Sequence, residues 1–131
     1  MAYLRRQNRH LSGYKLSDAC KGNTLDQEAQ FWLVNGFVAC RSRLNARYLV
    51  TPDRGARSLS YQRHVAQYLS HIVFGLSTAY LSANTNRHRS SLMDAFRIIE
   101  DDRDDKLVDK ALTYAEISLR AMYCSVEGEL Q

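Results

Sequence analysis

STAYLSANTNRHRSSLMDAFRIIE, residues 77–100, decides the fold because it reads as two helices joined by a tight turn. Ser77 resembles a helix N-cap that opens the short segment TAYLSA, and NTN at 84–86 is a cluster of turn-forming residues. The apolar positions that follow recur at steps of four and three residues, the spacing of an amphipathic helix: Leu92, Phe96 and Ile99. A short helix, a turn and a longer helix form the pattern of a helix-turn-helix.

The start of the second helix carries positive charge at the end where a helix dipole disfavours it. Arg87, His88 and Arg89 fall in its expected first turn, whereas cations gain about 0.3–1 kcal/mol near a helix C-terminus. An anion would make this placement favourable, because the arginines could reach phosphates or guanine acceptors and Ser90 and Ser91 offer hydroxyls. The alternative to anion binding is a purely structural one. Surface arginines at a helix start destabilise a protein only slightly, and they also occur on proteins that never bind DNA.

Composition indicates one domain with an uneven distribution of charge. The chain has 131 residues, of which 45% are hydrophobic, and this suits a single packed core. Residues 1–63 hold 11 Lys and Arg against 4 Asp and Glu, while residues 64–131 hold 7 against 10. A basic half on a small protein favours an anionic partner, either nucleic acid or an acidic membrane surface.

The cysteines and the apolar segments favour a cytoplasmic protein without a membrane partner. Cys20, Cys40 and Cys124 are odd in number, far apart and in no CxxC pair, so we expect reduced thiols. The basic N-terminus is not followed by an apolar signal region, and the longest apolar stretch, FWLVNGFVAC, is about half the length that crosses a bilayer.

The chain is expected to be all-α: a single compact helical domain that contains the helix-turn-helix, with a C-terminal amphipathic helix packed on it. Only one proline is present, and no segment alternates apolar and polar residues as a strand does. Residues 1–23 read as a basic, loosely structured arm and residues 24–131 as the helical domain, with the helix-turn-helix at about 77–100.

The helices outside this motif are predicted from caps and spacing. The sequence predicts a helix after the capping box at Thr24, a short turn around Tyr48 and Leu49, and a helix that Ser60 caps and Gly75 ends. A last amphipathic helix covers residues 106–123, with Asp104 and Asp105 placed to serve its first turn.

Three segments carry a family resemblance: RGARSLSYQRHVAQYL, GLSTAYLSA and NRHRSSLMDAFRIIEDDRDD. The first resembles the Arg-rich loop and the long helix of the C-terminal DNA-binding domain of the bacterial replication initiator DnaA. The second resembles its Leu-Ser-Leu segment, and the third resembles its recognition helix. The likeness covers residues about 37–105, with one deletion just before Arg87. The chain resembles especially the stand-alone alphaproteobacterial proteins of this domain family, which lack the ATPase module.

The resemblance implies a set of DNA contacts. An arginine of the basic loop, Arg54 or Arg57, would enter the minor groove. The starts of the long and short helices would contact the phosphate backbone through Arg63, His64, Ser77 and Thr78.

The expected recognition helix departs from the family at two positions. Arg87 keeps the family's arginine and Ser90 and Ser91 replace two threonines, but His88 stands for Asp and Arg89 for His. These departures change the donors and acceptors in the major groove, so we expect a different DNA site. Arg89 would favour guanine, in a contact worth about 1–3 kcal/mol when bidentate.

These features predict a sequence-specific double-stranded DNA-binding protein, a nucleoid-associated transcriptional regulator that acts by occupying its site. The chain lacks a G-x-x-x-x-G-K-[ST] loop, so neither ATPase activity nor origin melting is expected. Competition for origin-like sites during replication is an alternative. Because one helix-turn-helix contacts few base pairs, a homodimer or the basic arm is a candidate source of added affinity.

Two other function classes are alternatives to DNA binding. The four histidines show no HExxH, HxH or CxxC spacing, so we expect no enzyme, no metal site and no cofactor. A protein-interaction module is the stronger rival, since eight tyrosines, Trp32 and the helix at 106–123 could form a partner surface.

Overall fold

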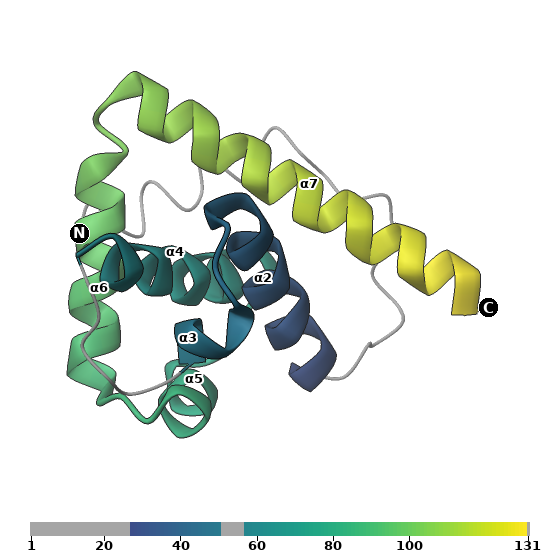
Figure 1. Cartoon of the computed structure of the whole chain (residues 1–131), viewed down its shortest axis with the longest axis horizontal. Helices are drawn as coiled ribbons and strands as arrows, with labels where there is room; N and C mark the ends of the chain where they lie inside the picture. The colour runs from purple at the N-terminus through teal and green to yellow at the C-terminus, as the bar shows by residue number, and fades with distance from the viewer. Residues whose placement is uncertain (1–26, 51–56, 131) are drawn as a thin grey trace.

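The computed structural model of the chain describes residues 27–50 and 57–130, with the backbone alone described at residues 57, 58 and 125–130. Every element in these ranges is a helix, so the expected all-α class is confirmed. The helices are α2 (Gln27–Ser42), α3 (Ala46–Val50), α4 (Arg57–Phe74), α5 (Thr78–Thr85), α6 (Arg89–Asp102) and α7 (Lys106–Leu130) (Figure 1). The expected arm at 1–23 and the capping-box Thr24 lie outside the described residues.

The central helix of the fold is α4, which contacts α2, α3, α6 and α7. Figure 1 shows α7 running along one side of the molecule, while α6 lies at the end opposite the C-terminus. The apolar positions that predicted the second helix of the motif are all fully buried: Leu92, Phe96 and Ile99. They join one core with buried side chains of the other helices, among them Val34, Leu69, Leu76, Leu81 and Leu119.

The C-terminal end of α4 forms as predicted, but its start does not. Gly75 has φ +68° and its N–H donates to the carbonyl of His71 at 3.0 Å, the geometry of a glycine that ends a helix. The helix begins at Arg57, so the expected cap Ser60 lies inside it and that prediction is wrong. The short turn expected around Leu49 is the helix α3, which buries that leucine.

Local hydrogen bonds fix the start of α5 and the turn between α5 and α6. Ser77 is the N-cap of α5, as predicted, and its hydroxyl accepts from the N–H of Tyr80 at 3.1 Å. Asn86 takes the left-handed conformation with φ 57°, and the hydroxyl of Ser82 donates to the carbonyl of Arg87 at 2.5 Å. Because α6 begins at Arg89, Arg87 lies in the turn and not in the first helical turn as expected.

The last helix covers the core as predicted, although α7 extends past residue 123 to Leu130. Of the two aspartates expected to serve its start, Asp105 accepts a hydrogen bond from the N–H of Leu107 at 2.8 Å. No helix within 27–50 and 57–130 is long and apolar enough to span a bilayer.

The cysteines differ from the expectation of reduced thiols. Cys40 is exposed and free, but Cys124 is disulfide-bonded, so the expectation is wrong at that position. Cys20 lies outside the described residues. Spacing and an odd count did not reveal this bond because pairing depends on which segments the fold brings together.

Candidate nucleic-acid interface

The candidate site is the start of α6 together with the turn before it, residues 87–91, which we call the α6 tip. His88, Arg89, Ser90 and Ser91 are all exposed, and Arg87 is half-buried. His88 is the N-cap residue but makes no side-chain capping hydrogen bond, and the first turn holds no acidic residue. The backbone N–H groups of this turn therefore lack a side-chain cap and can donate hydrogen bonds to an anion.

The charges of the tip are uncompensated within the described part of the chain. Among these residues neither Arg87 nor Arg89 forms an ion pair, whereas Arg97 on the same helix pairs with Asp94 at 3.3 Å. The two guanidinium groups therefore lie near the positive end of the α6 dipole without a counter-ion from the described residues. That arrangement destabilises the isolated helix slightly and favours an external anion.

His64 of α4 lies close enough to the tip to interact with it. The side chain is half-buried, and its pKa is lowered by burial first, and then by the positive charges of Arg87 and Arg63. The structure thus brings the first half of α4 close to the turn that precedes α6.

Arg63 does not belong to this surface. The residue is 1% exposed, and its Nε donates to the backbone carbonyl of Tyr48 at 2.8 Å. It therefore anchors the end of α3 on α4, and the expected phosphate contact is wrong because the guanidinium is buried. Because arginines are seldom fully buried, this role of Arg63 could not be predicted from its residue type.

The other expected contacts fall into two groups. At the start of α5, Ser77 is exposed and Thr78 is half-buried, so both lie at the surface. Ser77 uses its oxygen as an acceptor for the α5 cap, which leaves its proton for a second partner. Arg54 lies outside the described residues, and of Arg57 only the backbone at the start of α4 is described.

A histidine links α4 to the turn before α5 and to the middle of α6, the helix that carries the α6 tip. His71 of α4 donates its Nδ1–H to the carbonyl of Leu76, at 2.8 Å, in the turn that leads to α5. Its ring also stacks on Phe96 of α6. The spacing of the histidines in the sequence did not reveal this bracing role.

The far end of α6 is fixed by a buried polar cluster around Arg103. Its Nη1 donates to Glu116 at 2.6 Å and to the hydroxyl of Tyr68 at 3.0 Å, and its Nε donates to Asp109 at 2.7 Å. The Tyr68 hydroxyl in turn donates to Glu100. Burial raises the pKa of Tyr68, so the phenol stays protonated and keeps this hydrogen bond.

The described residues offer no candidate metal site: 27–50 and 57–130 contain no cluster of three His, Cys, Asp or Glu side chains that could bind an ion. In comparisons with known proteins, no family model, no curated protein and no solved structure matches the chain. The resemblance to the DnaA domain therefore stays a prediction based on the three segments quoted above.

Proposed function

We propose that the chain is a sequence-specific double-stranded DNA-binding protein and that the α6 tip enters the major groove. The observation that carries the proposal is the structure of the α6 tip. Its first helical turn is uncapped and holds the exposed residues Arg89, Ser90 and Ser91, and it follows Arg87 and His88 in the chain. A transcriptional regulator that acts by occupying its site is the simplest role for such a reader. Competition at origin-like sites is the alternative role.

The charge pattern of α6 supports an anionic partner. Arg87 and Arg89 lie at its positive end, and Asp101 and Asp102 lie at its negative end. At both ends the side-chain charge therefore has the same sign as the helix dipole, which is unfavourable. The acidic end has a neighbour inside the fold, because the carboxylate of Asp102 lies close enough to the Tyr61 hydroxyl to raise the pKa of that phenol. The two arginines of the basic end have no carboxylate partner in the described ranges, and phosphate would supply one.

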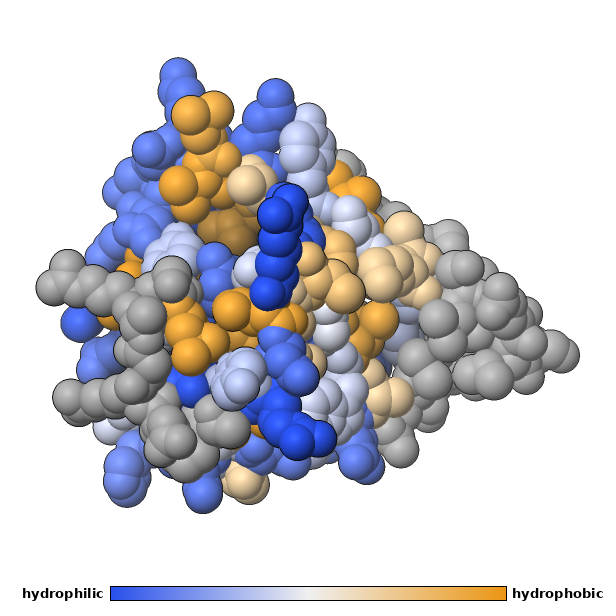
Figure 2. Space-filling model, in the orientation of Figure 1, coloured by the Kyte–Doolittle hydropathy of each residue, from blue (hydrophilic) through white to orange (hydrophobic). Residues whose placement is uncertain are grey.

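The arrangement of the helices supports a duplex rather than a small anion. The elements α5, turn and α6 follow one another with a three-residue turn, and the second helix of such a motif presents its N-terminal end to base edges. Figure 1 places the start of α6 beside α5 at one edge of the molecule. Hydrophilic residues predominate along the lower edge in Figure 2, where these two helices meet the solvent.

Each residue of the proposed interface has a distinct task. Arg89 is proposed to read guanine, while Ser90 and Ser91 offer hydroxyls to neighbouring bases or phosphates. Arg87 and His64 are proposed to meet the phosphate backbone on the α4 side. Ser77 and Thr78 at the start of α5 and, by the resemblance alone, Arg54 or Arg57 would add contacts that fix the register.

Selection of bound fragments from random-sequence duplexes, followed by a salt titration on the enriched site, tests the proposal. We expect one enriched motif, and an affinity that falls steeply with salt because each neutralised phosphate contributes a slope of about −0.9 in log K against log salt. Absence of an enriched motif, or an affinity that is insensitive to salt, would overturn the proposal.

A protein-interaction module is the second candidate, and the outer face of α7 favours it. Leu107 is 78% exposed, and Tyr114 and Met122 are also exposed. Hydrophobic residues reach the surface where α7 begins in Figure 2. If DNA binding proves insensitive to salt, this face becomes the better candidate for the functional surface.

A further inference from the structure

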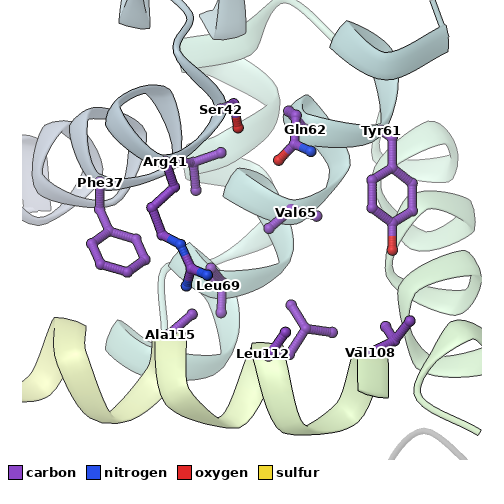
Figure 3. Close-up of a pocket in the computed structure, with 12 residues that line it drawn as sticks. Phe37, Arg41, Ser42, Tyr61, Gln62, Val65, Leu69, Val108, Leu112 and Ala115 are labelled. Atoms are coloured by element: carbon purple, nitrogen blue, oxygen red, sulfur yellow. The ribbon is translucent and has the colours of Figure 1, made fainter. Parts of the chain in front are cut away.

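A pocket lies between α2, α4 and α7, outside the proposed DNA-binding surface (Figure 3). None of its lining residues comes from α5 or α6. The cavity volume is about 320 Å³. This volume falls at the lower end of the range for small-molecule sites, about 300–1,000 Å³.

The walls of the pocket are mainly apolar, with branched side chains from three helices and one aromatic ring from α2: Phe37, Val38, Val65, Leu69, Val108 and Leu112. Leu69 is fully buried and Leu112 and Val38 nearly so, which gives the pocket a rigid floor. A ligand that fills it must therefore present an apolar body.

Arg41 is the single charged residue among the twelve that line the pocket. Figure 3 shows its side chain extending from α2 toward α7. The guanidinium lies over the ring of Phe37, 5.7 Å from the centroid, and forms no ion pair within the described part of the chain. A cation beside apolar walls without a counter-ion favours a carboxylate, which accepts two parallel N–H bonds from an arginine.

The other polar groups of the pocket are neutral. Ser42 and Gln62 can donate to a ligand oxygen. Burial and the neighbouring carboxylate of Asp102 raise the pKa of Tyr61 to about 12, so the phenol is neutral at physiological pH. The pocket thus presents one positive charge and no negative one from its lining residues.

We infer that this pocket binds a small monocarboxylate with an apolar body, whose carboxylate pairs with Arg41 while its body lies against Leu69 and Leu112. A cationic ligand would be repelled by the arginine, and a polyanion such as a nucleotide would find one cation and apolar walls. The inference does not depend on DNA binding, because it concerns a different surface.

Calorimetric titration of the full chain with octanoate, well below its micelle concentration and without DNA, tests this inference. We expect saturable one-to-one binding, at least tenfold weaker binding of octan-1-ol, which lacks the charge, and at least a tenfold loss of octanoate affinity in Arg41→Gln. The matched control is Arg43→Gln, which removes the same charge from an exposed arginine that does not line the pocket and should bind as the wild type does.

A second variant tests whether the ligand binds in this pocket by filling the cavity instead of removing its charge. Ala111 lines the pocket at an exposed position of α7, so Ala111→Phe should fill the cavity without disturbing the core and should abolish octanoate binding. Equal thermal unfolding midpoints would show that each variant is folded. Failure of octanoate to bind the folded full chain, equal affinity for octanoate and octan-1-ol, or unchanged affinity in Arg41→Gln would overturn the inference. So would a dimer that Ala111→Phe disrupts and octanoate does not, since a second copy would then occupy the groove.

Discussion

The ring of His71 lies flat against the ring of Phe96, with centroids 4.9 Å apart and planes inclined by 12°. This contact joins α4 to the middle of α6, and the hydrogen bond from His71 to the Leu76 carbonyl joins the same side chain to the turn before α5. One imidazole therefore links α4 both to the turn that leads to α5 and to α6, the helix that carries the α6 tip.

Replacing His71 with alanine is expected to destabilise the fold by about 1–3 kcal/mol. The loss combines the aromatic contact, about 0.5–1.5 kcal/mol, with a hydrogen bond of similar worth. His71→Phe keeps a ring and removes the donor, so its free energy of unfolding in urea should fall between those of the wild type and His71→Ala. Wild-type stability in His71→Ala would contradict the bracing role.

Arg103→Met is expected to destabilise the chain by about 3–5 kcal/mol. The substitution leaves the carboxylate of Glu116, which is 2% exposed, without its ionic partner. In the double variant Arg103→Met, Glu116→Leu the unpaired charge is gone, so we expect higher stability than in Arg103→Met alone.

The matched control for this cluster is Arg97→Met, which breaks an exposed pair with Asp94 on the same helix and should cost less than about 1 kcal/mol. Urea unfolding measures all three variants. Similar losses in Arg103→Met and Arg97→Met would show that the buried cluster contributes no more than a surface ion pair.

The lowered pKa of His64 predicts a loss of stability in acid. The imidazole titrates below its ordinary 6.5 in the folded chain, because burial and two arginines disfavour its charged form. Between the folded and unfolded pKa values the unfolded state binds more protons, so this contribution to stability falls as pH falls from about 6.5 through the folded pKa.

A comparison of the wild type with His64→Gln at pH 7.5 and pH 5.5 measures this contribution, since the other titrating groups are shared. On acidification the free energy of unfolding should fall further in the wild type than in His64→Gln. An equal fall in both chains would show that His64 titrates normally.

Local sequence signals predicted the ends of the helix-turn-helix because those ends depend on neighbouring residues. Gly75 ends α4 and Ser77 caps α5, since a left-handed glycine and a capping hydroxyl act within one turn of the backbone. The buried positions Phe96 and Ile99 were likewise given by spacing.

The polar interior could not be predicted in the same way. Arg103 stands within the run EDDRDD, which reads as a solvated linker, yet it is buried because Glu116 and Asp109 of α7 fold back over it. Arg63 and His64 are neighbours on α4. Arg63 is buried because α3 packs over it, whereas His64 remains at the surface. Contacts between residues far apart along the chain carry no periodic signal.

The most direct test of the central claim is the affinity of Arg89→Ala for the selected DNA site and for a random duplex, by competition at fixed salt. We predict a loss on the selected site of about 1–3 kcal/mol and a smaller loss on the random duplex, because a base-reading arginine contributes mainly to specific binding. Arg97→Ala on the same helix removes an equal charge away from the tip and should change both affinities little. Equal losses on the two duplexes in Arg89→Ala, or equal effects of the two substitutions, would contradict a reading role for the α6 tip.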